Sequence, residues 1–332
     1  MAGAENGPEM GTDTKTVDPV VQQQLVNSQA QSTDRSDQVK RIGRQVAIFA
    51  IFVVALAALY TGYKALAISL DNGQTDWPII GGLIPRGDDL NMPPIGDIVG
   101  AFGDTPRGSE GTYTTALFGE GLFTLREAAV GFAVGLVVGL SIAIAIALAR
   151  WRWLDRGLLP YVIASQTVPL VAIAPIVVIW GRNSFDFLPW QWQDWMSVSI
   201  IAAYLTFFPV AVNGLRGLQS PESQDLELMD SYASSWLQTL WRLRLPASVP
   251  YLFAALKIAA TASIVGAIVG EISAGVSGGL GRRLLSEALN YTTGPERLYA
   301  SVIGAAVLGI AVFLIVTGTE RLVLSRQNRE AL

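Results

Sequence analysis

The sequence predicts an all-α membrane protein, a polytopic helical bundle of about six transmembrane helices with a short cytoplasmic helix. Of its 332 residues, 51% are hydrophobic and 15% are charged, well below the roughly 25% charged residues of soluble domains. Apolar runs of about 20 residues, long enough to span a bilayer core, recur along the chain. Short charged stretches separate these runs, which is typical of a bundle and not of a single anchor.

The residue types that are missing exclude several function classes. The sequence contains no cysteine and no histidine. We therefore expect no disulfide, no metal site, no cofactor and no catalytic residue. The net charge of −4 is small and the basic residues lie at loop edges, so no nucleic-acid partner is implied. No lysine follows a glycine, which excludes a G-x-x-x-x-G-K phosphate-binding loop in this chain.

The N-terminal segment, residues 1–44, is polar and rich in Gln, Ser, Thr, Asp and Gly. Such a segment has too little apolar surface to offset its ordering entropy, so we expect a disordered cytoplasmic tail. The first apolar run begins too late for a cleaved signal peptide. We expect the first transmembrane helix within 45–70 and an external segment at 71–119.

The apolar runs that define the expected spans are 46–70, 128–148, 159–180, 198–215, 252–270 and 298–318. The last five of them lie in a permease-sized core, 120–323, which leaves a C-terminal cytoplasmic tail at 324–332. Gly131, Gly135 and Gly139 lie on one face of the second run, and this spacing predicts a close contact with another helix.

Prolines interrupt the third run. Pro169 and Pro175 lack backbone donors, so the carbonyls that they free need partners from a packed bundle or from a water-filled cavity. We therefore expect a broken helix that lines a pore.

Charge asymmetry orients the bundle, because cytoplasmic loops carry an excess of Lys and Arg. With both termini in the cytoplasm every inner segment is basic, whereas 71–119 is acidic. One outer loop, with Arg282, Arg283 and Arg297, argues against this orientation but is outweighed by the others. We expect a multi-pass protein of a bacterial or archaeal plasma membrane.

The longest cytoplasmic segment, 220–248, lies between the fourth and fifth spans. Ser220 as N-cap and Pro221 at the first helical position predict a short surface helix, and Pro246 is expected to end the helical stretch.

The spacing within this segment resembles the cytoplasmic loop of bacterial binding-protein-dependent importer permeases. Its pattern is E-A-A, three residues, G, nine residues, I, any residue, L-P, and the corresponding residues are Glu227, Ala233, Leu243, Leu245 and Pro246. Leu228 and Met229 replace the two alanines, and Ala233 at the Gly place allows the turn less freedom. The resemblance implies that this loop, which includes Asp230, couples the chain to an ATPase.

Further stretches over roughly 124–321 strengthen the resemblance, namely TLREAAVGFAVGLVVGL, SQTVPLVAIAPIVVIW, FFPVAVNGLRGL and VGEISAGVSGGLGRRL. Together they are similar to the nitrate, sulfonate, taurine and bicarbonate importer permeases, which have a MetI-like transmembrane domain. The resemblance implies a non-enzymatic permease subunit of an ATP-driven importer for a sulfonate, nitrate, bicarbonate or vitamin precursor. It implies separate ATP-binding cassette ATPase subunits, a second permease copy or paralogue in a dimer, an external solute-binding protein and surrounding membrane lipid.

Few polar residues lie within the spans. Glu271 ends the fifth apolar run and is a candidate for gating or the substrate path, because a charge in the bilayer is costly. The alternative is an interfacial carboxylate paired with an arginine such as Arg282. The other candidates for the translocation pathway are Gln166, Asn213 and the two prolines of the third run, Pro169 and Pro175. Their alternative role is to satisfy backbone groups freed by the prolines.

Two other function classes compete with an ATP-driven permease. An ion-coupled secondary transporter would need membrane carboxylates or repeated halves, and the sequence shows neither a repeat nor a carboxylate chain. A membrane enzyme without Cys or His would need a Ser–Lys or carboxylate pair, and none is evident.

Overall fold

The computed structural model describes residues 43–44, 47–69, 87–106, 111–148, 160–184 and 191–330, and the regular elements in these residues are all helical. Among them, the helices long and apolar enough to cross a membrane are Ala47–Ser69, Tyr113–Ala147, Asp194–Leu218, Trp236–Ala274 and Pro295–Leu324. A shorter apolar helix, Leu170–Asn183, occupies the remaining expected span. The all-α membrane bundle is confirmed. Apart from 43–44, the expected tail 1–44 lies outside the described residues.

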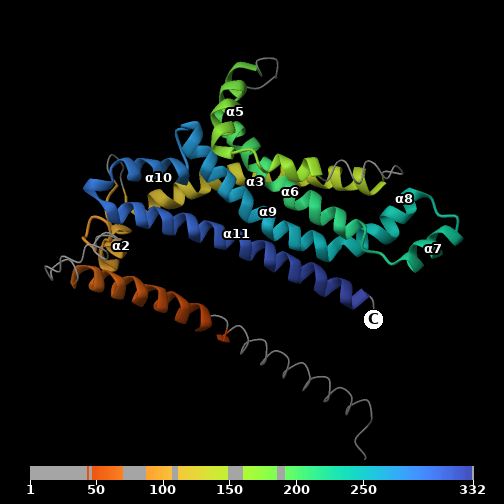
Figure 1. The fold of residues 1–332 in the computed structure, drawn as a ribbon, viewed down its shortest axis with the longest axis horizontal. Coiled ribbons are helices and arrows are strands. Elements are labelled where there is room, and N and C mark those ends of the chain that lie inside the picture. The colour runs from red at the N-terminus through yellow and green to blue at the C-terminus, as the bar shows by residue number, and fades with distance from the viewer. Residues whose placement is uncertain are drawn as a thin grey trace, which may run out of the picture. The chain divides into compact units, whose positions relative to one another are not determined.

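The chain forms two compact units, Met1–Gly87 and Asp88–Leu332. The first contains the helix Ala47–Ser69, whose large apolar side chains are mostly exposed, as a lipid-facing helix requires. The second contains the helices labelled in Figure 1 and both candidate functional sites.

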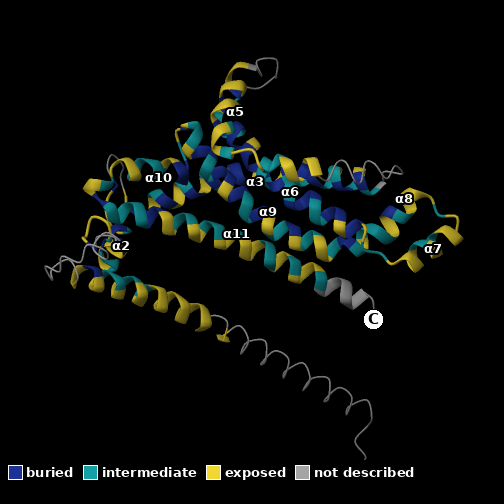
Figure 2. Ribbon diagram, in the orientation of Figure 1, coloured by how far each residue is buried: buried dark blue, intermediate teal, exposed yellow. Residues whose placement is uncertain are grey.

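The centre of the second unit consists of α3 (Tyr113–Leu148), α6 (Asp194–Leu218) and α9 (Leu245–Ala274). Helix α6 packs against both of the others and is the most deeply buried of the long helices (Figures 1 and 2). Helix α11 (Pro295–Glu330) packs on α9 and leaves an apolar face exposed. The short helices α2 (Ile95–Ala101) and α10 (Leu280–Leu289) both contact α11.

Helix α3 begins at Tyr113, and not near 128 as the apolar run indicated. The residues between these positions include Glu120, Thr124 and Glu127, which interrupt the hydropathy of the sequence. Spaced at i, i+4 and i+7, they lie on one helix face, where Thr124 and Glu127 are completely buried and Glu120 is partly buried. Similarly, α11 continues to Glu330, through most of the expected tail 324–332.

The glycine stripe of α3 is a helix contact, as predicted. A Cβ atom at Gly131 would lie 2.5 Å from the Cβ of Ala202, and one at Gly135 would lie 2.5 Å from the Cβ of Thr206. Helices α3 and α6 therefore approach more closely than side chains at these positions would permit.

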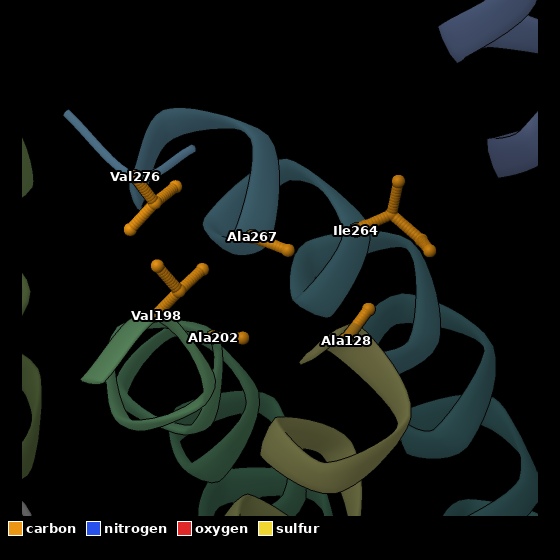
Figure 3. Close-up of a cluster of buried hydrophobic side chains, with 6 residues drawn as sticks. All are labelled: Ala128, Val198, Ala202, Ile264, Ala267 and Val276. Carbon is orange, nitrogen blue, oxygen red and sulfur yellow. The ribbon is translucent and has the colours of Figure 1, made fainter. Parts of the chain in front are cut away.

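A small apolar cluster completes the contact among the three central helices, and it consists of Ala128, Val198, Ala202, Ile264, Ala267 and Val276 (Figure 3). Val276, which follows α9, faces Val198 on α6 (Figure 3). The chain that leaves α9 is therefore packed back onto the bundle.

The third apolar run is broken at its proline, as predicted. A helical turn at 160–165 ends in a bend, and α5 (Leu170–Ser184) follows Pro169. Pro169 cannot donate to the carbonyl of Ser165, four residues earlier. The hydroxyl of Tyr204 on α6 donates to that carbonyl instead. A packed bundle thus provides the missing donor.

The segment 220–248 contains α7 (Ser223–Ser231), α8 (Trp236–Thr239) and a π-helical stretch (Leu240–Arg244) that runs into α9. It lies at one end of the bundle, and α10 lies at the other (Figure 1).

Two details of the prediction for this segment were wrong. Ser220 does not cap α7, because its hydroxyl donates to the carbonyl of Gly217, 2.7 Å away, and Glu222 is the N-cap. Pro246 does not end a helix but lies in the first turn of α9. The wider π-helical turn before Pro246 accommodates a residue that cannot donate.

Candidate functional site

Glu271, near the end of α9, is completely buried, and both of its carboxylate oxygens accept hydrogen bonds. The hydroxyl of Thr124 on α3 donates to Oε1 at 2.7 Å. The backbone N–H of Gly281, in the first turn of α10, donates to Oε2 at 2.5 Å. Glu271 therefore connects α9 to two other helices through its carboxylate.

The free N–H groups at the start of α10 are satisfied by side chains of other helices. The N–H of Leu280 donates to the hydroxyl of Thr124 at 2.8 Å, and the N–H of Gly279 donates to Oε2 of Glu120 at 2.6 Å. With the Glu271–Gly281 bond, α3 and α9 provide every one of these acceptors. We call Glu120, Thr124, Glu271 and the loop Gly279–Gly281 the clasp. Acidic groups also complement the positive end of a helix dipole.

Glycines make the clasp possible. Gly279 has φ +94°, a conformation that side chains rarely adopt, and a Cβ there would overlap the carboxylate of Glu271. A Cβ at Gly281 would lie 2.8 Å from the Cβ of Glu271. The backbone at Gly279 and Gly281 thus lies closer to Glu271 than residues with side chains would permit.

Glu127 lies one helical turn beyond Thr124 on α3 and is also completely buried. Neither of its carboxylate oxygens has a hydrogen-bond donor among the described residues. Its carboxyl group interacts with that of Glu271 on α9. Arg126, the adjacent residue in the chain, lies over the ring of Trp195 at 3.8 Å.

These contacts correct two expectations from the sequence. Glu271 forms no ion pair with Arg282 among the described residues, because backbone and hydroxyl donors occupy its oxygens. The expectation that the spans contain no pair of carboxylates was also wrong, because Glu127 on α3 interacts with Glu271 on α9. The polar positions 120, 124 and 127 on one helix face were the signal that the sequence offered.

The arginines of the outer loop have local partners. Arg283 lies 3.4 Å from Glu120 and 3.8 Å from Glu287, and Arg297 lies 3.8 Å from Asp104. These pairs do not alter the count of Lys and Arg from which the orientation is inferred.

The turn between α7 and α8 forms a second candidate site. The N–H of Ser234 donates to the carbonyl of Met229 at 3.1 Å, and the N–H of Ala233 to that of Asp230 at 2.9 Å. These two bonds define a Schellman motif with Ala233 at the position where glycine is usual. Ala233 has φ +49°, the one positive value of a non-glycine residue among those described. The residue matched to the Gly place thus has the backbone conformation that favours glycine.

The surface around this turn is unusually apolar for an exposed segment. Ser235 and Gln238 form a capping box that fixes the start of α8. The large apolar side chains exposed here are Leu228, Tyr232, Trp236, Leu237 and Trp241, and Figure 2 shows α7 and α8 as largely exposed. Exposed apolar groups gathered in this way are typical of a protein-binding surface.

The other residues of the matched pattern divide between surface and core. Glu227 and Asp230 on α7 are exposed, as is Pro246. Leu243 is half-buried, and Leu245 packs against the cluster that contains Leu240. The segment therefore presents its α7 half outward and anchors its α9 half in the bundle.

The remaining candidates for a pathway do not converge on one point. Gln166 lies in the break before α5, and its buried Nε2 has no partner among the described residues. Pro169 and Pro175 are exposed. Asn213 donates to the carbonyl of Pro209 within α6 at 2.9 Å, which is a structural role.

Known proteins similar to this chain are transport permeases. The formylaminopyrimidine transport permease protein ThiX of Halalkalibacterium halodurans is 32% identical over 53% of this chain and 66% of its own length. The riboflavin transport system permease protein RibX of Chloroflexus aurantiacus is 29% identical over 37% and 42%. The chain thus spans less than two thirds of the length of these relatives. A putative aliphatic sulfonates transport permease protein, SsuC of Bacillus subtilis, is 27% identical over 76% and 83%.

The fold also resembles solved structures. In an inward-facing conformation of the MetNI methionine ABC transporter, one chain superposes with a TM-score of 0.55 at 15% identity, over 63% of this chain and 96% of that one. A second crystal form gives a TM-score of 0.52 at 17% identity. Residues 135–328, more than half of the chain, match the family described as binding-protein-dependent transport system inner membrane component. The chain belongs to this family of inner-membrane transport components.

Proposed function

We propose that the chain is the membrane permease subunit of an ATP-driven importer, with an external binding protein that delivers the solute. The family and the permease relatives support this assignment. The solute is a small molecule of the sulfonate, nitrate, bicarbonate or vitamin-precursor kind, which includes the classes named for the relatives. The pore forms between this chain and a second permease copy or paralogue.

The observation that carries this proposal is the turn at Ala233. Its Schellman geometry places two short helices at the end of the bundle, with Tyr232 and Trp236 exposed beside it. A separate ATPase subunit binds this surface, and its movement reaches the bundle through the continuous helix that runs from Trp236 into α9. The segment thus couples ATP hydrolysis elsewhere to motion of α9.

Substitution at Ala233 tests the coupling surface. Ala233→Asp adds a charge at the docking surface, and its desolvation on assembly weakens ATPase binding. Aspartate tolerates positive φ better than alanine, so the chain itself still folds. Ala233→Gly is the matched control, because it relieves the backbone and adds no charge. Co-purification of the ATPase should fall for the aspartate variant alone, at equal membrane abundance.

Glu227→Lys gives an independent test at the other end of the turn. Glu227 is exposed, and its interaction with the helix dipole contributes only about 0.3–1 kcal/mol, so the variant stays folded. ATPase association and uptake should both decrease. Thr292→Asp, an exposed position beyond α10, is the control. Normal uptake in both the Glu227 and the Ala233 variant would contradict the assigned role of this segment.

The proposed orientation places this segment and both termini in the cytoplasm, and Asp88 outside. Because the chain has no cysteine, a single introduced cysteine reports without background. Both Asp88 and Ser223, the first residue of α7, are exposed. Asp88→Cys should react with a membrane-impermeant maleimide in intact cells, and Ser223→Cys should react only after lysis. The opposite pattern would reverse the orientation.

A further inference from the structure

Two buried carboxyl groups face each other between α3 and α9, and they differ in what surrounds them. Glu271 accepts bonds from Thr124 and from the N–H of Gly281, one at each oxygen. Glu127 has no donor among the described residues, and both side chains are completely buried. Hydrogen bonds to a carboxylate favour its charged form, so this asymmetry marks Glu271 as the ionised member.

Among the described residues, no cation forms an ion pair with Glu127 or Glu271. The charged groups on the surrounding helices have other partners, and these groups are Glu120 with Arg283, Glu287 with Arg283, Arg126 over Trp195, Asp194 with Arg182, Lys257 with Glu320 and Arg297 with Asp104. Two ionised carboxylates in contact, without water or a cation, are strongly unfavourable. Glu127 can contact Glu271 favourably only if it has an O–H to donate.

We propose that the Glu127–Glu271 pair is a proton-binding site inside the membrane bundle, in which Glu127 holds the proton and donates it to the Glu271 carboxylate. Binding is a simple protonation, in which one proton from the medium forms the O–H bond of Glu127. The proton also determines how firmly α10 is held, because Glu271 is the residue of the clasp that binds Gly281. Its release places two negative charges together and weakens this attachment. The inference does not depend on the proposed transport function.

Infrared spectroscopy of the purified full-length chain in lipid nanodiscs tests the proposal directly. A protonated glutamic acid has a carboxyl C=O stretching band that a carboxylate lacks. At neutral pH the wild-type spectrum should contain such a band, and Glu127→Gln should lose it. Glu127→Asp keeps a carboxyl group and should shift the band, which identifies the carrier even if the amide variant does not fold. Glu320→Gln is the control, because Glu320 lies on α11 outside the clasp and pairs with Lys257.

Hydrogen–deuterium exchange of 279–283 gives a second readout. Wild type should lose amide protection when the infrared band titrates away, whereas Glu127→Gln, compared at the same pH, should keep it. The absence of a band that depends on Glu127 would overturn the proposal. A band that appears only after sodium or potassium is removed would also overturn it, because a metal cation would then occupy the pair. Equal loss of the band in Glu320→Gln would show that the band does not come from Glu127, and this result would also overturn the proposal.

Discussion

The hydroxyl of Thr124 donates to Oε1 of Glu271 at 2.7 Å and accepts the N–H of Leu280 at 2.8 Å. One buried side chain of α3 thereby joins α9 to α10. Thr124 is 147 residues from Glu271 and 156 from Leu280 along the chain, so its hydroxyl makes tertiary connections in addition to its bond with the carbonyl of Glu120 in its own helix. It is the natural position at which to test the clasp.

Thr124→Val should destabilise the clasp while preserving shape. The change leaves an oxygen of Glu271 and the N–H of Leu280 without their partner, and each unsatisfied buried group costs about 1–3 kcal/mol. Thermal unfolding in detergent should show the loss, and amides at the start of α10 should exchange faster. Thr206→Val is the control, since the Thr206 hydroxyl donates to the carbonyls of Ala202 and, at 3.5 Å, Ala259, and contacts neither Glu271 nor α10. Equal effects at both positions would contradict a special role for Thr124.

Gly279→Ala should be more harmful than Gly275→Ala. Both glycines have positive φ, but Gly275 is left-handed α-helical, where alanine costs about 1–2 kcal/mol, whereas Gly279 (φ +94°, ψ 166°) lies in a region that is essentially restricted to glycine. Gly275 has open space around its Cβ position, whereas a Cβ at Gly279 would overlap the carboxylate of Glu271. The difference between the two melting temperatures therefore combines the greater backbone strain at Gly279 with the steric overlap there. Similar melting temperatures would show that the carboxylate can move aside without cost.

The sequence predicted the parts of the fold that depend on local pattern. Apolar runs located the spans, the spacing of Gly135 and its neighbours predicted a close contact with another helix, and Pro169 predicted the break before α5. In each case the signal lies within one helix and reflects a single physical requirement, such as burial, close approach or a missing donor.

The clasp could not be predicted in the same way. Glu127 and Thr124 lower the hydropathy of the sequence, so the apolar run was set to begin only at 128, and residues 113–119 of α3 were assigned to the external segment. Their burial is acceptable only because Glu271 and the loop at Gly279 cover them, and those residues come from distant parts of the chain. The role of Glu271 was open for the same reason, since nothing in the sequence indicated whether its partner is an arginine or a backbone N–H.

Gly135→Ala should loosen the contact between α3 and α6. A Cβ there would lie 2.5 Å from the Cβ of Thr206 and 2.7 Å from the carbonyl oxygen of Ala203, which belongs to a helix backbone and cannot rotate away. Gly119→Ala, on the same helix with open space, should stabilise α3 by up to about 1 kcal/mol through helix propensity. Opposite signs of the change in melting temperature are therefore expected. A gain in both variants would refute the close approach of the two helices.

Lys257 on α9 and Glu320 on α11 form the ion pair that attaches the outer helix to the bundle, with Nζ 3.0 and 2.8 Å from the two carboxylate oxygens. Their side chains are 26% and 18% exposed, so water screens this pair only partly. Lys257→Met leaves the Glu320 carboxylate without its cation, and loss of a charged hydrogen bond costs about 1.5–3 kcal/mol. Adding Glu320→Gln should restore part of this loss, because the remaining group is then neutral.

The control for this cycle is an exposed pair in the same chain. Arg182 binds Asp194 through two hydrogen bonds, at 2.7 and 2.6 Å, but its side chain is 54% exposed. A pair of this kind usually contributes about 0–1 kcal/mol. Thermal unfolding of the single and double variants at both sites should therefore give a clear coupling energy for Lys257 with Glu320 and a small one for Arg182 with Asp194. Additive effects at Lys257 and Glu320 would mean that apolar packing, and not this ion pair, holds α11 on α9.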